Sequence, residues 1–398
     1  MKIAAIQTDR ITDGGGFSQA FSAIRQMARL CENRYDFVVF TSEAENIQYF
    51  DQLGIEAKIF RSGIMDKLVA AAATGRFTRT FLSTLTRRNA MGQLERELQT
   101  NKVDLAYFVS PSRQSMALQK TNYIATVWDL CHRDSPEFPE VRENFQFQSR
   151  EFTYSNTLSR ALFVLCDSET LCDRVSKRYG VDKERLVAMP FSPGPLIGSL
   201  HSESKETVLE HYGLEQGYYF YPAQFWAHKN HVRVLQALAL LNEKNITAVV
   251  VFSGGDKGTM SHVKATAEKF GVDAQVKFLG FVPTEHVRGL YEGCQAVVMP
   301  SYFGPTNLPP LEAWELKKPL LYSAPFNDQS GPAALYFDPD SAVELARAME
   351  DVADSKVSDK LIREGTQRLA EIGRIREQAE KAMLGRLEVF ARRLECWS

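Results

Sequence analysis

The residues most able to do chemistry stand together between positions 301 and 314. They read Ser-Tyr-Phe-Gly-Pro-Thr-Asn-Leu-Pro-Pro-Leu-Glu-Ala-Trp and follow a short apolar run at 296–299, which predicts a buried parallel strand. The two prolines favour a helix that begins here, because a first helical turn needs no N–H from them. Asn307 is the expected cap, and Glu312 is expected in or near the first turn. Such a helix start suits a phosphate, and a carboxylate one turn in could hold ribose hydroxyls. An ordinary capped helix explains the pattern equally well.

A second group of polar residues follows another predicted strand. Residues 221–231 read Tyr-Pro-Ala-Gln-Phe-Trp-Ala-His-Lys-Asn-His and precede an amphipathic helix at 234–241. Lys229 would stand at the carboxyl end of that strand, where parallel α/β sheets bind ligands. Taken alone, such a lysine is more often a solvated surface charge. Gly254 follows a further strand and permits close backbone approach to a ligand, although a plain tight turn fits equally well.

Together these motifs resemble the donor-site signature of family 4 glycosyltransferases, which have the GT-B fold. The usual form of the signature is Glu-Gly-Phe-Gly-Leu-Pro-Pro-Leu-Glu-Ala, and residues 308–313 match it one for one. The resemblance implies that Lys229 and the helix start bind the diphosphate of a nucleotide sugar and that Glu312 binds its ribose. One position departs from the signature, since the first glutamate of the family's pair falls on Gly304.

The resemblance carries further positions over to donor binding. Gln224 stands near the place of a second cation in the family, Val282 lies in a loop that borders the nucleotide base, and the glycine loop at 13–18 approaches the diphosphate and the acceptor. The base itself stays open. The predicted donor-binding residues are Gly15, Gly16, Gln224, Lys229, Gly254, Val282, Thr306, Asn307, Leu308 and Glu312.

Two residues after the predicted strand at 124–128 are candidates for catalysis. The segment Thr126-Val127-Trp128-Asp129-Leu130-Cys131-His132 resembles the family's His-Asp-Leu element, with tryptophan where the histidine often stands. Asp129 and His132 could orient the sugar or exchange a proton with the acceptor. The alternative is a buried structural pair held by hydrogen bonds.

The spacing of apolar runs predicts an α/β protein with two doubly wound parallel sheets. With 398 residues, two domains are expected. A proline-rich stretch at 190–195 predicts the boundary between them. The runs stand at 3–6, 37–40, 105–109, 124–128, 162–166, 186–189, 218–221, 248–252, 276–279, 296–299, 320–322 and 335–337.

These observations define the predicted domains. Residues 1–195 are expected to form an acceptor-side Rossmann-like domain and residues 196–375 a Rossmann-like donor domain, which face each other across a cleft in the GT-B fold. Residues 376–398 belong to a last helix, expected from about Arg374 to Cys396. In the family this helix often packs back on the first domain, and its apolar stripe consists of Met383, Leu387, Phe390 and Leu394.

Composition narrows the function classes. A net charge of −2 argues against a nucleic-acid partner held by global basicity. Six scattered cysteines without metal-ligand spacing predict reduced thiols. The start of the chain reads as a strand and not as a signal peptide, and no apolar stretch reaches the roughly 20 residues of a membrane-spanning helix. We therefore expect a cytoplasmic protein. No Asp-x-Asp element indicates a metal-bound diphosphate, so no metal or other cofactor is expected.

One stretch, residues 61–88, is locally basic. Its cations are interleaved with apolar side chains, which suits contact with anionic lipid headgroups on the inner membrane face. A helix packed inward with a solvated basic face fits equally well. The cations are Arg61, Lys67, Arg76, Arg79, Arg87 and Arg88, and the apolar residues are Ile64, Leu68, Val69, Phe77, Phe81, Leu82 and Leu85.

The resemblance implies a glycosyltransferase that moves a hexosyl or deoxyhexosyl group from a nucleotide diphosphate sugar to an acceptor hydroxyl. It implies retention of anomeric configuration and no obligatory metal. The Gly-Pro-Thr-Asn-Leu-Pro-Pro-Leu-Glu variant is similar to bacterial surface-polysaccharide transferases, which implies a glycan or lipid-linked glycan acceptor in O-antigen or capsule assembly. Two alternatives stay open, a nucleotide-sugar epimerase on the same fold and a catalytically degenerate partner subunit, the latter because of Gly304 and Gln224.

Overall fold

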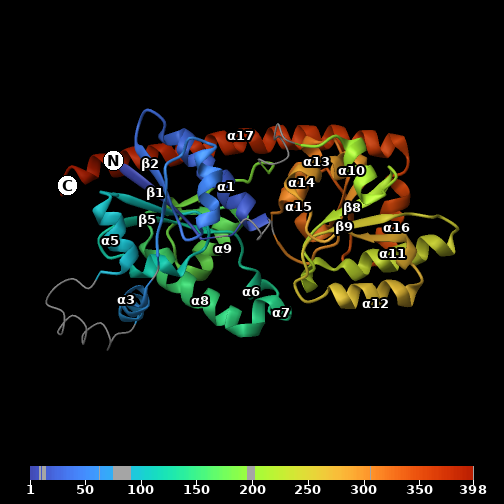
Figure 1. Cartoon of the computed structure of the whole chain (residues 1–398), viewed down its shortest axis with the longest axis horizontal. Helices are drawn as coiled ribbons and strands as arrows, with labels where there is room; N and C mark the ends of the chain where they lie inside the picture. Colours follow the sequence, from blue (N-terminus) through green and yellow to red (C-terminus); the bar gives the residue numbers. More distant parts are fainter. Residues whose placement is uncertain are drawn as a thin grey trace. The chain divides into compact units, whose positions relative to one another are not determined.

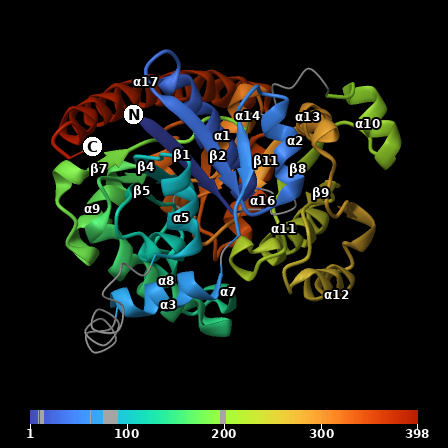
Figure 2. The same cartoon turned by 60° about the vertical axis from the view of Figure 1, so that its left-hand side comes forward.

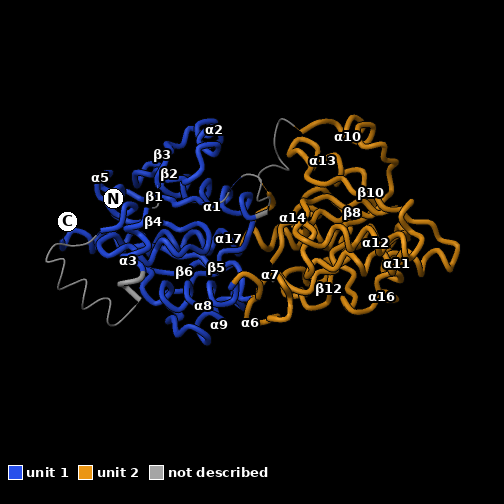
Figure 3. Tube along the Cα trace, turned by 60° about the horizontal axis from the view of Figure 1, so that its bottom comes forward, with its two compact units in different colours: residues 1–130, 145–191, 375–398 blue, residues 131–144, 192–374 orange. Residues whose placement is uncertain are grey.

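The computed structural model describes residues 1–8, 10, 15–61, 63–74, 91–194, 202–304 and 306–397. They form two compact units (Figure 3). Unit 1 comprises residues 1–130, 145–191 and 375–398, and unit 2 comprises residues 131–144 and 192–374. Each unit is built on its own parallel sheet.

In unit 1 the described strands form a seven-stranded parallel sheet in the order β3-β2-β1-β4-β5-β6-β7. The order reverses between β1 and β4, the switch point of a doubly wound sheet. The strands are β1 (Lys2–Gln7), β2 (Asp36–Thr41), β3 (Ala57–Ile59), β4 (Leu105–Phe108), β5 (Asn122–Val127), β6 (Val164–Cys166) and β7 (Leu186–Ala188).

Helices cover both faces of this sheet (Figures 1 and 2). Alternate strand residues enter different cores, since Ile3 and Ala5 belong to one cluster and Ala4 and Ile6 to the other. The first cluster includes side chains of α1, α2 and α17, and the second includes side chains of α5, α8 and α9. The helices are α1 (Gly15–Cys31), α2 (Ile47–Asp51), α3 (Ile64–Thr74), α5 (Gln93–Thr100), α8 (Gln146–Thr157) and α9 (Glu169–Tyr179).

Unit 2 repeats this architecture with six described parallel strands in the order β10-β9-β8-β11-β12-β13. The switch point lies between β8 and β11, so the loops after these two strands lie side by side. The strands are β8 (Tyr218–Pro222), β9 (Val250–Ser253), β10 (Val276–Phe278), β11 (Cys294–Met299), β12 (Leu320–Ser323) and β13 (Leu335–Phe337).

The helices of unit 2 flank its sheet, with α11 packed against α12 and α16, and α10 packed against α13 (Figure 1). Two short helices, α6 and α7, come from the segment 131–144, which lies between two parts of unit 1 in the sequence. The helices are α6 (Cys131–Asp134), α7 (Pro139–Arg142), α10 (Lys205–Tyr212), α11 (His231–Glu243), α12 (Met260–Phe270), α13 (Thr284–Gly293), α14 (Leu308–Glu315), α15 (Asn327–Ser330) and α16 (Ala342–Asp351).

The last helix, α17 (Ser355–Leu394), belongs to both units, since unit 2 ends at Arg374 and unit 1 resumes at Ile375. It begins about twenty residues before the predicted start at Arg374. Its predicted apolar stripe is buried in the core of unit 1, in the cluster that contains α1. Within the described ranges, no helix is both apolar and long enough to cross a bilayer.

The predicted α/β class with two Rossmann-like sheets is confirmed. Each of the twelve apolar runs overlaps a strand. The strand that the pattern missed is β3, at the edge of the first sheet. Its residue Ile59 is 51% exposed, and an edge strand that is not covered on both faces lacks the continuous apolar run used for the prediction. The two units differ from the predicted domains, because residues 131–144 cluster with unit 2 and unit 2 resumes at Ser192.

Candidate functional site

The candidate site lies in unit 2, where the loops after β8 and β11 meet. After β8 the chain makes a single 3-10 turn, η7 (Ala227–Lys229), and then enters α11. Asn230 joins the two with φ of +55°, a left-handed conformation that asparagine tolerates better than most residues. Its side-chain amide donates to the carbonyls of Pro300 and Pro339, at 3.2 and 2.9 Å. This position therefore fixes the loop that carries Lys229.

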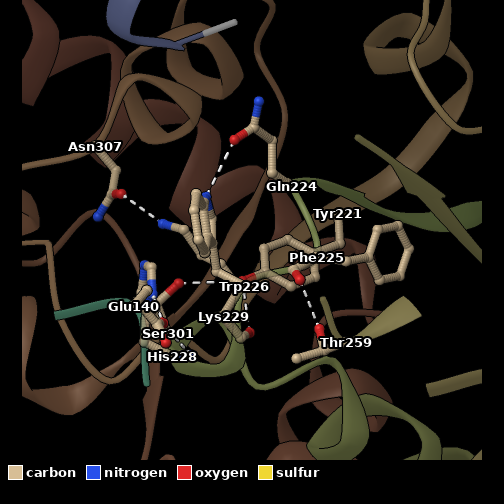
Figure 4. Close-up of polar contacts among 10 residues, drawn as sticks. All are labelled: Glu140, Tyr221, Gln224, Phe225, Trp226, His228, Lys229, Thr259, Ser301 and Asn307. Atoms are coloured by element: carbon tan, nitrogen blue, oxygen red, sulfur yellow. Dashed lines mark hydrogen bonds and ion pairs between the residues drawn. The ribbon is translucent and has the colours of Figure 1, made fainter. Parts of the chain in front are cut away.

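The Lys229 side chain points toward the loop after β11 (Figure 4). Its ammonium Nζ donates to Oδ1 of Asn307 at 3.2 Å, and its backbone carbonyl accepts from the buried Tyr221 hydroxyl at 2.7 Å. Loss of water around the ammonium lowers the pKa of Lys229 to about 8. A lysine held this way is a half-buried cation at the carboxyl end of a central strand, which is where an anion would be bound.

Asn307 is the N-cap residue of α14, as predicted, but its side chain makes no capping hydrogen bond. Its amide instead donates to the Gly304 carbonyl at 2.8 Å and to the Tyr322 hydroxyl at 2.7 Å. Its backbone N–H and carbonyl are both paired with the side chain of Gln329. This network leaves Oδ1 for Lys229 and so ties the two loops together.

The start of α14 has fewer free backbone N–H groups than the sequence pattern predicted. Leu308 is the first residue of α14, and the prolines at 309 and 310 that follow it carry no N–H. The Asn307 N–H is already bonded to Gln329. Among residues 307–310 only Leu308 can therefore donate a backbone hydrogen bond to a ligand, and Lys229 is the main positive group here.

Glu312 lies one turn into α14 and is largely enclosed. Its Oε2 accepts a hydrogen bond from the buried Tyr291 hydroxyl at 2.6 Å. On the other side, a Cβ added at Gly194 would come within 2.7 Å of Oε1, so only glycine fits there without a shift. Burial raises the pKa of Glu312 to about 7, although the Tyr291 bond opposes the shift. The carboxyl group is thus poised to accept hydrogen bonds from ligand hydroxyls.

Three other predicted donor residues lie in loops at the carboxyl ends of β8, β9 and β10. Gln224 accepts a hydrogen bond from the Trp226 indole at 3.1 Å. Gly254 has φ of +150°, and an added Cβ would lie 2.3 Å from the Ala223 carbonyl oxygen. The close approach that this glycine allows is therefore to the chain's own backbone. Val282 lies half-buried between β10 and α13. Donor contact by these residues stays a prediction.

The remaining predicted residues belong to different parts of the structure. Gly15 and Gly16 begin α1 in unit 1. Asp129, also in unit 1, forms an ion pair with Arg150 at 2.8 Å. His132 is fully buried in α6, which belongs to unit 2. Catalytic roles for Asp129 and His132 stay predictions.

Sequence reasoning missed a cluster around His228. The carboxylate of Glu140, on α7, accepts from both the backbone N–H and the imidazole Nδ1 of His228. Phe303 stacks on the imidazole with centroids 3.8 Å apart, and Phe138 packs edge-on against both rings. No local sequence pattern links the two residues, because Glu140 lies 88 residues before His228.

The segment that holds most of these residues matches a known family. Residues 210–368 match the family described as Glycosyl transferases group 1. This segment belongs to the glycosyl transferases group 1 family. It contains Gln224, Lys229 and the whole of α14, so the recognition made from the motifs is confirmed.

Two solved structures share the fold of the whole chain. HepE of Anabaena in complex with UDP has a TM-score of 0.68 and 15% identity, covering 96% of this chain and 99% of its own. WaaG, a glycosyltransferase involved in lipopolysaccharide biosynthesis, has a TM-score of 0.65 and 16% identity, covering 95% and 98%. At such identities the likeness establishes the fold, which is GT-B.

One relative in sequence is the O-antigen chain mannosyltransferase B of Escherichia coli. It is 25% identical over 230 residues, which are 54% of this chain. The match spans only 57% of the relative's own length.

Proposed function

We propose that the protein is a glycosyltransferase that moves a sugar from a nucleotide diphosphate sugar to an acceptor hydroxyl. The observation that carries the proposal is the meeting of Lys229 with the start of α14 at the switch point of unit 2, with Glu312 one turn further on. The group 1 match over this same segment supports it. The donor diphosphate would contact the Lys229 ammonium and the Leu308 N–H, and the ribose would contact Glu312.

The proposed chemistry follows from where charge develops. Breaking the bond between sugar and phosphate builds positive charge on the anomeric carbon and negative charge on the leaving diphosphate. A half-buried ammonium stabilises that negative charge more than a solvated one would. We propose that transfer retains the anomeric configuration, as the resemblance implies, and that it needs no obligatory metal. Asp129 and His132 are the proposed contacts to the sugar or acceptor.

The biological setting is proposed from the relatives. One relative acts in O-antigen synthesis and a structural neighbour in lipopolysaccharide synthesis, as their names state. The HepE structures hold UDP or UDP-glucose, which supports a nucleotide sugar as donor. We therefore propose a hexosyl or deoxyhexosyl donor and a glycan or lipid-linked glycan acceptor in bacterial surface-glycan assembly, in the cytoplasm.

Peripheral contact with the inner membrane face belongs to the same proposal. Much of the predicted basic stretch at 61–88, namely residues 75–88, lies outside the described residues. In the described part, α3 exposes Ile64, Met65 and Leu68, at 77%, 39% and 49%, and Lys67 is exposed beside them. An apolar face with cations at its edge suits an anionic lipid surface.

The deciding experiment is a transfer assay with purified protein, a panel of nucleotide sugars and lipid-linked acceptors. Lys229→Ala and Glu312→Ala should each lower kcat/KM at least about 100-fold, because each removes a contact to the donor. Lys269→Ala changes an exposed lysine on α12 and should leave the rate unchanged. Chelator should not alter the wild-type rate.

Two results would contradict the proposal. Conversion of the donor without any acceptor would identify an epimerase. Failure to bind any nucleoside diphosphate in calorimetry would identify a degenerate partner subunit.

A further inference from the structure

The segment 131–144, here called the strap, joins two stretches of unit 1 in the sequence but packs with unit 2. Its two short helices, α6 and α7, put Phe138 and Glu140 against the loop after β8. The strap therefore contacts the turn that carries Lys229.

Glu140 holds His228 at two points. Its Oε1 accepts from the His228 backbone N–H at 2.9 Å and from the imidazole Nδ1. The Glu140 side chain is 7% exposed and the His228 side chain 10%. Burial alone would raise the pKa of Glu140, but the hydrogen bonds from His228 outweigh it and hold the pKa below its usual value. The strap thus brings a charged carboxylate into the interior of unit 2.

His228 is also held on its other sides. Its carbonyl accepts from the Tyr302 N–H at 2.9 Å, and its ring stacks on Phe303. Phe138 of the strap contacts the rings of both Tyr302 and Phe303, with centroids 5.3 and 5.4 Å away. His228 immediately precedes Lys229, so whatever fixes His228 also fixes the backbone from which the Lys229 ammonium extends.

The charge of Glu140 also acts on the Lys229 ammonium. Among the described residues, the titratable groups whose charges act on Lys229 are Cys131 and Glu140 of the strap, and Lys229 in turn acts on His231 of α11. Burial lowers the pKa of His231 to about 3, so it is uncharged at neutral pH. The Glu140 carboxylate is the anion in this set, and it opposes the loss of the proton from Lys229. The family's first glutamate, which would add a second carboxylate, is glycine here at 304.

We propose that Glu140 is a positioning residue of the donor site: it anchors His228 and so holds the Lys229 ammonium where the donor diphosphate binds. The inference rests on the proposed function, since it assumes that Lys229 contacts the diphosphate. It assigns to the strap a role in donor binding, although the strap lies about 90 residues before Lys229 in the sequence.

The test compares Glu140→Gln with Glu137→Gln by calorimetry with UDP and GDP between pH 6.5 and 9. Both variants lose one carboxylate from the strap, but Glu137 is exposed. Glu140→Gln keeps the size of the side chain, and thermal melting checks that the protein stays folded. We expect Glu140→Gln to bind the better of the two nucleotides about tenfold more weakly at pH 7.5.

The pH profile separates positioning from a general loss of structure. Affinity of the wild type should fall as pH rises through about 8, where Lys229 loses its proton. In Glu140→Gln that fall should begin at lower pH, because the neighbouring negative charge is gone. Glu137→Gln should follow the wild type. Equal affinity and equal profiles for both variants would overturn the inference.

Lys229→Ala distinguishes this inference from the function on which it rests. Unchanged nucleotide affinity in Lys229→Ala would refute the proposed phosphate contact itself. Lost affinity in Lys229→Ala together with wild-type behaviour of Glu140→Gln would refute only the role of Glu140. If both single variants lose affinity, the double variant should bind no more weakly than Lys229→Ala, because the two side chains act through one contact.

Discussion

Gly304 stands where the family signature has its first glutamate, and the local structure at this position suits glycine. Its φ is +104°, a conformation that residues with a side chain rarely adopt. A Cβ there would also lie 3.2 Å from Oδ1 of Asn307, the atom that accepts from Lys229. Glycine therefore suits both the backbone and the amide network at this position. The absence of the family's glutamate is matched by a local structure built for glycine.

The Glu312 carboxylate should lower the stability of the unliganded protein, and we propose that the same group binds the ligand. Its pKa rises from 4.5 to about 7 on folding, so its contribution to stability is present below pH 4.5 and lost as pH rises through 7. Glu312→Gln removes the charge and keeps an acceptor for Tyr291. We expect the unliganded variant to gain ~1–3 kcal/mol in free energy of unfolding at pH 8 and less at pH 5.5.

Chemical denaturation at the two pH values measures this gain, and calorimetry with UDP and GDP measures the accompanying loss of affinity. A stability change that is the same at both pH values would show that the ionised carboxylate is not the cause.

At the scale of elements, α3 has one buried side and one exposed apolar side. Asp66 and Val69 are buried, while Ile64 and Leu68, one turn apart, are exposed. Asp66 accepts from the N–H groups of Gly63 and Leu94, which fixes the start of the helix against α5. The helix is therefore anchored on one side and leaves an apolar side uncovered by the described residues.

If α3 contacts lipid, Ile64→Ser together with Leu68→Ser should weaken binding to vesicles of anionic phospholipid at least about fivefold, because the interface loses two exposed aliphatic side chains that lipid would bury. Sedimentation with vesicles measures the bound fraction. Val343→Ser changes a residue that is 68% exposed on α16 in unit 2, and it should have no effect. Equal binding of all variants would place the membrane contact elsewhere.

At the scale of the whole molecule, α17 connects the ends of the chain. Glu380 accepts from Gln26 and Arg29 of α1 at 2.6–2.7 Å, across more than 350 residues of sequence. Arg376 lies 3.6 Å from the same carboxylate. Glu380 is 7% exposed, so its removal leaves polar groups without their partner in a largely dry contact.

Glu380→Ala should therefore lower the free energy of unfolding by ~1–3 kcal/mol. Glu388→Ala, on the same helix, removes an ion pair with Arg34 in which both side chains are about half exposed, and it should cost less than ~1 kcal/mol. Urea denaturation gives both values. Equal effects of the two variants would mean that the contact of α17 with α1 adds little to stability.

The sequence by itself determined the fold class and the sites that depend on neighbours in the chain. Apolar runs predicted twelve of the described strands, because strands that are largely buried on both sides show little polar alternation. The Pro-Pro-Leu-Glu and His-Lys-Asn-His motifs located Lys229 and Glu312, since loop chemistry after a strand is written in consecutive residues.

The tertiary structure alone decided what depends on contacts between distant segments. It directed the amide oxygen of Asn307 to Lys229 and not to the helix N-terminus, and it brought Glu140 to His228 across 88 residues. It also set the pKa of Glu312, because burial depends on which segments surround a side chain. The spacing of residues along the chain determines local structure. Contacts between distant segments depend on the free energy of the whole fold, so a local pattern does not predict them.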